Sequence, residues 1–462
     1  MRYVSTRGSA PTLDFEEAML TGLARDGGLY VPETVPRIDA GELAALAGRP
    51  YEEVALRVIA PFVGDAFSHA ELSGAVARAC GAINHPARAP LAQIGANHFV
   101  LELFHGPTLA FKDFAMQLIA QLFEISLKRR GRRATIIGAT SGDTGSAAIE
   151  AFAGLDAVDV VILFPDGRVS AVQRRQMTTP AAANVHALAI AGDFDAAQAR
   201  VKDMFNDFAF RDAVGLAAVN SINWARVLAQ VVYYVTAALS LGAPHRGVDF
   251  TVPTGNFGDI YAGSIARRMG VPIGRLVIAT NRNDILHRTL ETGDYTTQGV
   301  AATISPSMDI QVSSNFERAL FDAYGREGRA VAQLMDELRG AGGFAISQGA
   351  LGALREGYAS GRADEADTAD AITRTHRDAG MLLCPHSAVG VKVAEEHIGA
   401  APMVTLATAH PAKFPDAVAA ATGQRPELPP RMADLFDLPE RFTRVPDDLG
   451  AIQSLIRERI SA

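Results

Sequence analysis

The spacing of hydrophobic positions changes near residue 133 of the chain. Before that point apolar residues recur mainly at helical spacing, and we predict helices over residues 15–20, 41–47, 51–63 and 70–79. Asp14 precedes the first of these and is a favourable N-cap residue. The pattern therefore predicts a mainly helical N-terminal domain over residues 1–95.

From residue 133 onwards, short apolar runs rich in β-branched residues alternate with helical patterns. Strands are predicted at residues 134–138, 158–164 and 185–190, with helices at 170–177 and 196–208. This alternation is typical of a doubly wound, mostly parallel sheet with helices on its faces. Residues 133–220 are numerous enough to form a small α/β domain of their own.

The remainder continues the α/β pattern with longer helical parts. A helix is predicted from about residue 221 to 241, and strands at residues 250–253, 276–280 and 404–407. Residues 290–315 are predicted to be loop, 316–380 mostly helical, and the charged stretch 360–370 a surface linker. The longest apolar run, 227–241, is too short and too interrupted by polar residues to span a membrane.

Composition narrows the class of protein. A chain of 462 residues exceeds the size of a single hydrophobic core, so several domains are expected. The net charge of -8 argues against nucleic acid or an anionic membrane as the main partner. The only two cysteines, Cys80 and Cys384, exclude a disulfide scaffold, and the N-terminus has no signal-peptide pattern. We therefore expect a cytoplasmic protein.

Lys112 is the first candidate for chemistry. Its neighbours Leu109, Ala110, Phe111 and Phe114 are apolar, and it stands at the predicted start of a helix that Gly131 would cap. Burial and the positive end of a helix both favour the neutral amine. A neutral, partly buried amine is what Schiff-base chemistry requires, whereas a lysine that merely extends to solvent is the structural alternative.

A glycine-containing loop between a predicted strand and a helix is the second candidate. It comprises Gly255, Asn256, Phe257, Gly258 and Asp259. Free backbone N–H groups at a helix N-terminus form an anion site, and small residues allow close approach of a phosphate. The loop has neither the Walker pattern nor GxGxxG, and a tight turn without any ligand is the alternative.

A second such junction holds Ser141, Gly142, Asp143 and Thr144. Its hydroxyl and N–H groups suit a carboxylate or phosphate, while an ordinary helix cap is the alternative.

Ser221 and Arg226 lie at the start of the next predicted helix. A serine hydroxyl and an arginine fork could bind one anion together, and a cap serine with a surface arginine is the alternative. Zinc-ligand spacing and the GxSxG pattern of many hydrolases are both absent from the sequence, so no metal is expected.

A desolvated lysine, two anion-binding loops and a doubly wound frame together describe a site for pyridoxal 5′-phosphate. The chain resembles the threonine synthases that carry an extra N-terminal domain, within fold type II of the pyridoxal enzymes. The resemblance covers nearly the whole chain. Its motifs, in chain order, are YVSTRG, DGGLYVPE, HGPTLAFKDF, TSGDTGSAA, NSINWAR, PTGNFGD, SPSMDIQVSSNFER and ATAHPAKF.

The resemblance implies a fold of two doubly wound, mostly parallel sheets with the helical N-terminal domain added. Residues 96–132 and 221–462 would form the large domain that binds the cofactor, and residues 133–220 the small one. A monomer or a small homo-oligomer is expected.

The resemblance also implies roles for single residues. Lys112 would hold the cofactor covalently and act as the base. The loop from Gly255 to Asp259 would bind its phosphate, and Thr408 would meet the pyridine nitrogen. The substrate's carboxylate and phosphate would bind to the remaining candidates: Ser141, Gly142, Asp143, Thr144, Ser221 and Arg226. Many relatives in this fold carry asparagine where Asp143 stands, so a contact with the cofactor's ring hydroxyl does not carry over.

The implied reaction converts O-phospho-L-homoserine and water to L-threonine and phosphate. Two alternatives remain open: a phospho-lyase or dehydratase acting on a related amino acid, and a protein of this family that has become a non-catalytic binding protein. The intact candidates Ser141, Thr144, Ser221 and Arg226 favour an enzyme.

Overall fold

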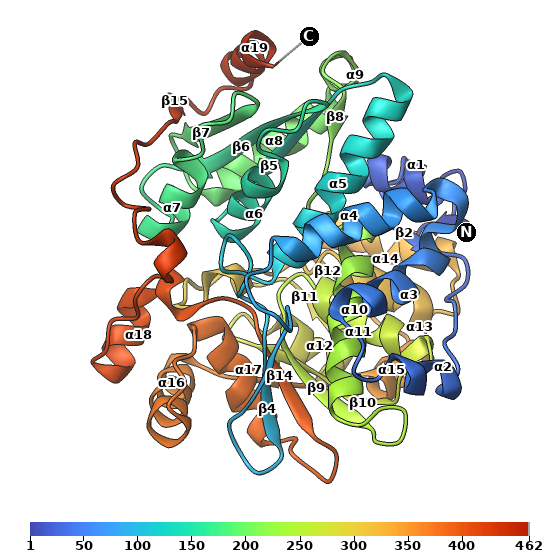
Figure 1. Ribbon diagram of the computed structural model, residues 1–462. Helices are drawn as coiled ribbons and strands as arrows, with labels where there is room; N and C mark the ends of the chain where they lie inside the picture. The colour runs from blue at the N-terminus through green and yellow to red at the C-terminus, as the bar shows by residue number, and fades with distance from the viewer. Residues whose placement is uncertain (461–462) are drawn as a thin grey trace.

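The computed structural model describes residues 1–460, and two parallel sheets organise it (Figure 1). The larger sheet has six strands in the order β13-β10-β9-β14-β4-β3. All its neighbours pair in parallel except the edge pair β3 and β4. Its strands are β3 (Leu91–Gln93), β4 (His98–Glu102), β9 (Val248–Pro253), β10 (Ile273–Thr280), β13 (Ala359–Arg362) and β14 (Met403–Ala407).

The smaller sheet has five strands, all paired in parallel, in the order β15-β7-β6-β5-β8. Its strands are β5 (Ala134–Ala139), β6 (Val158–Pro165), β7 (Val185–Ile190), β8 (Leu216–Ala217) and β15 (Thr443–Val445). The helices around it are α6 (Asp143–Phe152), α7 (Ala171–Thr178), α8 (Phe194–Asn206), α9 (Phe208–Ala213) and α19 (Leu449–Arg459). Every residue of β6 is buried, as expected for a central strand covered on both faces.

Helix α5 (Lys112–Arg130) runs beside α10 (Trp224–Ser240), and both belong to the largest hydrophobic core. The left-handed Gly131 ends α5, and its N–H donates to the carbonyls of Leu127 and Lys128. Helix α10 is buried on nearly all sides, which explains the long apolar run that we found in the sequence. It packs against α3, α5 and α11 (Gly258–Arg268).

The N-terminal part joins this core and carries a two-stranded antiparallel sheet. Its elements are β1 (Tyr3–Ser5), α1 (Phe15–Thr21), β2 (Tyr30–Pro32), α2 (Ala40–Leu46), α3 (Tyr51–Val63) and α4 (His69–Gly81). The strands β11 (Asp294–Thr296) and β12 (Gly343–Ala345), far apart in the chain, form a second two-stranded antiparallel sheet. The other helices are α12 (Ile285–Thr292), α13 (Phe316–Ala323), α14 (Gly328–Ala341), α15 (Gln348–Gly357), α16 (Glu365–Ala379), α17 (Pro385–Glu395) and α18 (Pro415–Thr422).

The C-terminal segment corrects our division of the chain. We assigned residues 221–462 to the large domain, but β15 pairs with β7 of the smaller sheet, at the top of Figure 1. Ile452 and Ile456 of α19 share a buried cluster with Val161 and Leu188 of that sheet. The apolar face of α19 is buried there, and no local pattern in the sequence specifies which sheet will cover it.

The helix expected over residues 196–208 is α8, which ends at Asn206 because the Asp207 side chain accepts from the N–H of Phe210 and starts a further helix, α9. Two local predictions were wrong. The expected linker 360–370 contains edge strand β13 and the start of α16, where Asp364 and Asp367 form a capping box. The expected loop 290–315 contains β11, which is paired to β12.

Candidate active site

The candidate residues come from segments that follow strands of both sheets. Thr408 follows β14, the loop 254–257 follows β9, and the loop 140–142 follows β5. In open parallel sheets the carboxyl ends of the strands are where ligands bind. The topology therefore brings together loops that are far apart in the sequence, on either side of Lys112.

Lys112 is the first residue of α5, as predicted, and its side chain is only 12% exposed. Its Nζ lies 3.3 Å from Oδ2 of Asp143. Burial lowers the pKa of the Lys112 amine, and although Asp143 opposes this, Lys413 and Arg226 lower it further. The amine is thus poised to lose its proton more easily than an ordinary lysine.

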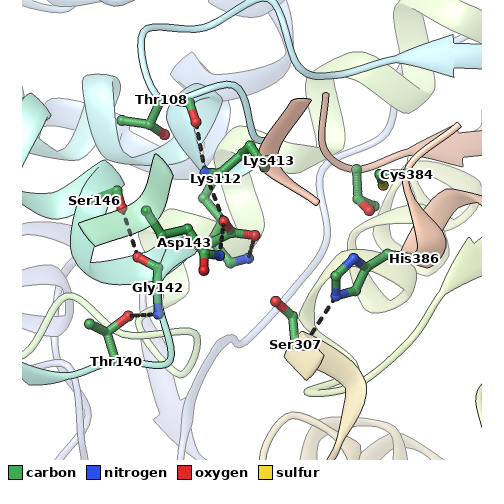
Figure 2. A network of polar contacts seen from close by, with 12 residues as sticks. Thr108, Lys112, Thr140, Gly142, Asp143, Ser146, Ser307, Cys384, His386 and Lys413 are labelled. Carbon is green, nitrogen blue, oxygen red and sulfur yellow. Dashed lines mark hydrogen bonds and ion pairs between the residues drawn. The ribbon is translucent and has the colours of Figure 1, made fainter. Parts of the chain in front are cut away.

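Asp143 lies between two lysines (Figure 2). Its Oδ1 is 2.7 Å from Nζ of Lys413 and accepts from the Gln173 amide at 2.9 Å, while its Oδ2 faces Lys112. Burial alone would raise the pKa of this carboxyl, but Lys413 and Lys112 hold it well below its usual range. Both oxygens therefore have protein donors, whereas we expected Asp143 to bind the substrate.

Lys413 and Gln173 are site residues that the sequence analysis missed. Lys413 is fully buried, and its Nζ also donates to the carbonyl of Thr108 at 2.7 Å. The motif ATAHPAKF offered a signal, because its lysine is surrounded by the apolar residues Pro411, Ala412 and Phe414. A lysine that is buried among such residues needs a partner for its charge. Gln173 lies in the first turn of α7 and gave no such signal.

The loop before α6 is held by its own polar groups. The Thr140 hydroxyl accepts from the N–H groups of Gly142 and Gly145, and the Ser146 hydroxyl donates to the Gly142 carbonyl (Figure 2). Gly142 has a φ of 139°, and a side chain there would overlap Gln173 at 2.3 Å. Ser141 and Thr144 flank this turn and are partly exposed.

The loop after β9 is strained in a way that suits anion binding. Phe257, at the N-cap of α11, has a left-handed backbone with φ of 64°, although its side chain is buried against Phe316 and Tyr358. A Cβ on Gly255 would lie 3.1 Å from the carbonyl oxygen of Ser307. The backbone is therefore close to its neighbours, and the start of α11 presents its N–H groups.

The polar segment 313–315 fixes this loop from the other side. The Ser313 hydroxyl donates to the Gly255 carbonyl at 2.6 Å, and the Asn315 N–H donates to the Asn256 carbonyl at 3.0 Å. The Asn315 side chain also donates to the carbonyl of Ser221. The two loops that we expected to bind the two phosphates are thus tied to one another.

Arg226 is 3% exposed, and its Nε and Nη1 have no hydrogen-bond partner among residues 1–460. Burial lowers the pKa of this guanidinium to about 10, against the pull of Tyr233 and Asp259. It lies in the first turn of α10, which begins at Trp224. A buried arginine with free donors is prepared for an anion.

Asp259 is turned away from the loop that precedes it. Its Oδ1 accepts from the hydroxyls of Tyr233 and Tyr234, at 2.5 and 3.0 Å. Burial raises the pKa of the Asp259 carboxyl to about 6, although both tyrosines and the charges of Lys112 and Arg226 lower it. Its carboxylate thus anchors α10 to α11, whereas the sequence grouped it with the cofactor's ligands.

Thr408 and His386 line the remaining side. The Thr408 N–H donates to the Ser387 hydroxyl, and its carbonyl accepts from the N–H of Phe111, next to Lys112. His386 Nε2 accepts from the Ser307 N–H at 3.1 Å (Figure 2). Burial lowers the pKa of His386 to about 4, so that its ring is neutral at physiological pH.

These residues fit the expected cofactor. A phosphate needs backbone N–H donors at a helix start, which the strained turn at Phe257 supplies, and an aldehyde needs a dry amine, which Lys112 supplies. The buried free donors of Arg226 remain for a second anion. Within residues 1–460 no group of acidic, histidine and cysteine side chains could hold a metal ion, and no helix there could span a membrane.

Comparisons with known proteins find relatives over nearly the whole chain. Residues 85–335 match the model of the pyridoxal-phosphate dependent enzymes, residues 2–80 the threonine synthase N terminus, and residues 387–456 the threonine synthase C-terminal model. A threonine synthase of Pseudomonas aeruginosa is 51% identical over 99% of this chain and 98% of its own.

Solved structures extend the likeness to three dimensions. The pyridoxal-phosphate-bound threonine synthase of Brucella melitensis has a TM-score of 0.98 and 58% identity, with both chains fully covered. The yeast threonine synthase has a TM-score of 0.93 and 37% identity, covering 99% of this chain and 98% of its own. These findings confirm the expected fold type and cofactor. The chain belongs to the threonine synthase family of pyridoxal-phosphate dependent enzymes.

Proposed function

We propose that this protein converts O-phospho-L-homoserine and water to L-threonine and inorganic phosphate. The observation that carries the proposal is the buried guanidinium of Arg226, whose Nε and Nη1 have no partner within residues 1–460. Leaving charged donors unpaired in a dry site is costly unless an anion binds them. The cofactor has its own phosphate loop, so this arginine is available to the phosphate of the substrate.

Each group has a role in the proposed reaction. The N–H groups of Gly255, Asn256, Phe257 and Gly258 bind the cofactor's phosphate. The Thr408 hydroxyl would meet the pyridine nitrogen, and a hydroxyl, unlike a carboxylate, would not hold that nitrogen protonated.

The substrate's two anionic groups bind to different loops. Ser141, Gly142 and Thr144 take its carboxylate, and Ser221 and Arg226 take its phosphate. This separation would align the carbon chain between them, with the reacting carbons beside Lys112.

Bound pyridoxal phosphate supplies a conjugated electron sink that makes carbanion character at Cα and Cβ accessible near neutral pH. Lys112 would hold the cofactor through its Nζ, and the same Nζ would carry protons at the substrate carbons. Because burial lowers the pKa of this amine, the neutral base forms more easily than in an ordinary lysine. The buried surroundings exclude bulk water from the reacting atoms.

The test measures phosphate release and threonine formation from O-phosphohomoserine, phosphate release from O-phosphothreonine, and ammonia release from L-threonine, each as a separate substrate. We expect O-phosphohomoserine to be turned over best and to give threonine. Faster release from O-phosphothreonine would identify a phospho-lyase, and ammonia from L-threonine a dehydratase. A normal cofactor spectrum with no turnover of any of the three would identify a binding protein.

Two further proposals concern the setting of the enzyme. We propose that it works in the cytoplasm as a monomer or small homo-oligomer, without nucleic acid or a membrane as partner. We also propose three domains: residues 1–95, a large domain of 96–132 and 221 to about 433, and a small domain of 133–220 joined by the C-terminal segment.

A further inference from the structure

Lys413 is the buried cation that the proposed chemistry does not use. It follows β14 of the larger sheet, in the short 3-10 turn Pro411–Lys413, while Asp143 begins α6 on the smaller sheet. The 2.7 Å contact between their charged groups therefore joins the two halves of the site, directly beside Lys112. A second bond, from Lys413 Nζ to the Thr108 carbonyl, fixes the direction of the amine.

The pair of Lys413 and Asp143 affects the protonation state of Lys112. A carboxylate paired with Lys112 alone would favour the ammonium form of Lys112, which is the wrong form for a nucleophile or a base. Nζ of Lys413 lies 2.7 Å from Oδ1 of Asp143, closer than Nζ of Lys112, which lies 3.3 Å from Oδ2. Its own positive charge also disfavours a second ammonium group nearby.

We propose that Lys413 is a positioning residue: it holds the Asp143 carboxylate across the site, so that Asp143 orients Lys112 without keeping that amine protonated. The inference depends on the proposed function only through the role of Lys112.

Other titratable groups near Lys112 stay constant in the comparison. They are Arg226 on α10, Asp259 on α11, Asp113 on α5 and His386 on α17. Burial raises the pKa values of Asp113 and Asp259 to about 6 and lowers that of His386 to about 4. Asp143, which the test changes, is the acidic residue whose side chain contacts Lys112 directly.

The test is a double-mutant cycle with Lys413→Met, Asp143→Asn and both together. Its main readout is the pH at which the absorption band of the bound cofactor changes. In Lys413→Met, Lys112 is the only cation left beside the Asp143 carboxylate. The midpoint should therefore rise by at least about one pH unit, which is a tenfold increase in the proton affinity of the Lys112 nitrogen. Asp143→Asn leaves an unpaired cation beside Lys112, so the midpoint should fall. The double variant should return close to the wild-type midpoint.

A second readout does not need the cofactor. In the full-length chain stripped of cofactor, with its fold verified by circular dichroism, the pH profile for acylation of Lys112 should shift in the same two directions. Lys202→Met, which removes an exposed lysine of α8, serves as the control and should shift neither profile.

Two outcomes would overturn the proposal. One is a midpoint in Lys413→Met that equals that of the wild type. The other is a shift of both single variants in the same direction, which is the result of a merely structural pair. The proposed function fails differently, because the band reports on the cofactor lysine whichever substrate the enzyme prefers.

Discussion

Two arginines, Arg226 and Arg318, are buried to a similar degree but differ in whether their guanidinium groups have hydrogen-bond partners. Both are almost inaccessible, at 3% and 0% exposure, and burial lowers the pKa of each to about 10. Arg318 donates to the carbonyls of Tyr30 and Ile222 and to the side chain of Asn315. Nε and Nη1 of Arg226, in contrast, have no acceptor within residues 1–460.

The difference separates a structural group from a binding group. The partners of Arg318 lie in β2, in the loop that precedes α10, and beside the cofactor loop, so it ties the N-terminal part to the active site. Thr6 and Arg7 reinforce this link by binding Glu317. Arg226 is buried as well, but its Nε and Nη1 stay free within residues 1–460. Burial alone therefore does not identify a functional arginine; its unused donors do.

The largest expected effect is that of Arg318→Ala on stability. Three acceptors would lose their donor, at about 1–3 kcal/mol each, so the free energy of unfolding should fall by roughly 3–9 kcal/mol. Urea unfolding of the loaded enzyme measures this, and Arg226→Ala is the matched control, because it removes a buried charge that has no partner to strand. Equal losses in the two variants would contradict the distinction.

The second effect concerns turnover. Arg226→Ala should lower kcat/KM for O-phosphohomoserine, with a loss equivalent to about 2–4 kcal/mol of transition-state stabilisation. Arg226→Lys should recover only part of this loss, because lysine keeps the charge but lacks the two-pronged guanidinium. The cofactor's absorption band should be unchanged in both. Wild-type kinetics, or a lost band, would show that the arginine serves another anion.

The third effect is a pH dependence of stability through Asp259, whose pKa burial raises to about 6. A carboxyl with a raised pKa contributes stability that is present below pH 4 and lost as the pH rises through 6, here on the order of 3 kcal/mol. Asp259→Asn should remove this loss. Because Arg226 lowers the pKa of Asp259, its alanine variant should lose more stability and continue to lose it to higher pH, as urea unfolding at a series of pH values can show.

The smallest effect uses phosphate itself as a probe. At several times its Kd, inorganic phosphate should stabilise the loaded wild-type enzyme by about 1 kcal/mol, and should not stabilise Arg226→Ala. Thermal unfolding with sulfate-free buffers measures this shift. Equal protection of both proteins would mean that the ion binds somewhere else.

The sequence by itself determined the local features of this protein. Helix α5 begins at Lys112 and ends at Gly131 as predicted, since apolar spacing and a glycine cap act over only a few residues. The strands β6 and β7 and the two glycine-containing loops were likewise recognised from short patterns. The motifs added the family and the cofactor, which the comparisons confirm.

Tertiary structure alone decided which distant segments meet. The sequence placed β15 and α19 with the wrong sheet, since their apolar residues fit either one. It also gave no role to Lys413, and it assigned Asp143 to the substrate, because the bond between them depends on how two sheets approach each other. Whether a charged side chain contacts water, has a hydrogen-bond partner or is buried without one depends on contacts between segments that are far apart in the sequence. Residue type and local spacing do not specify those contacts.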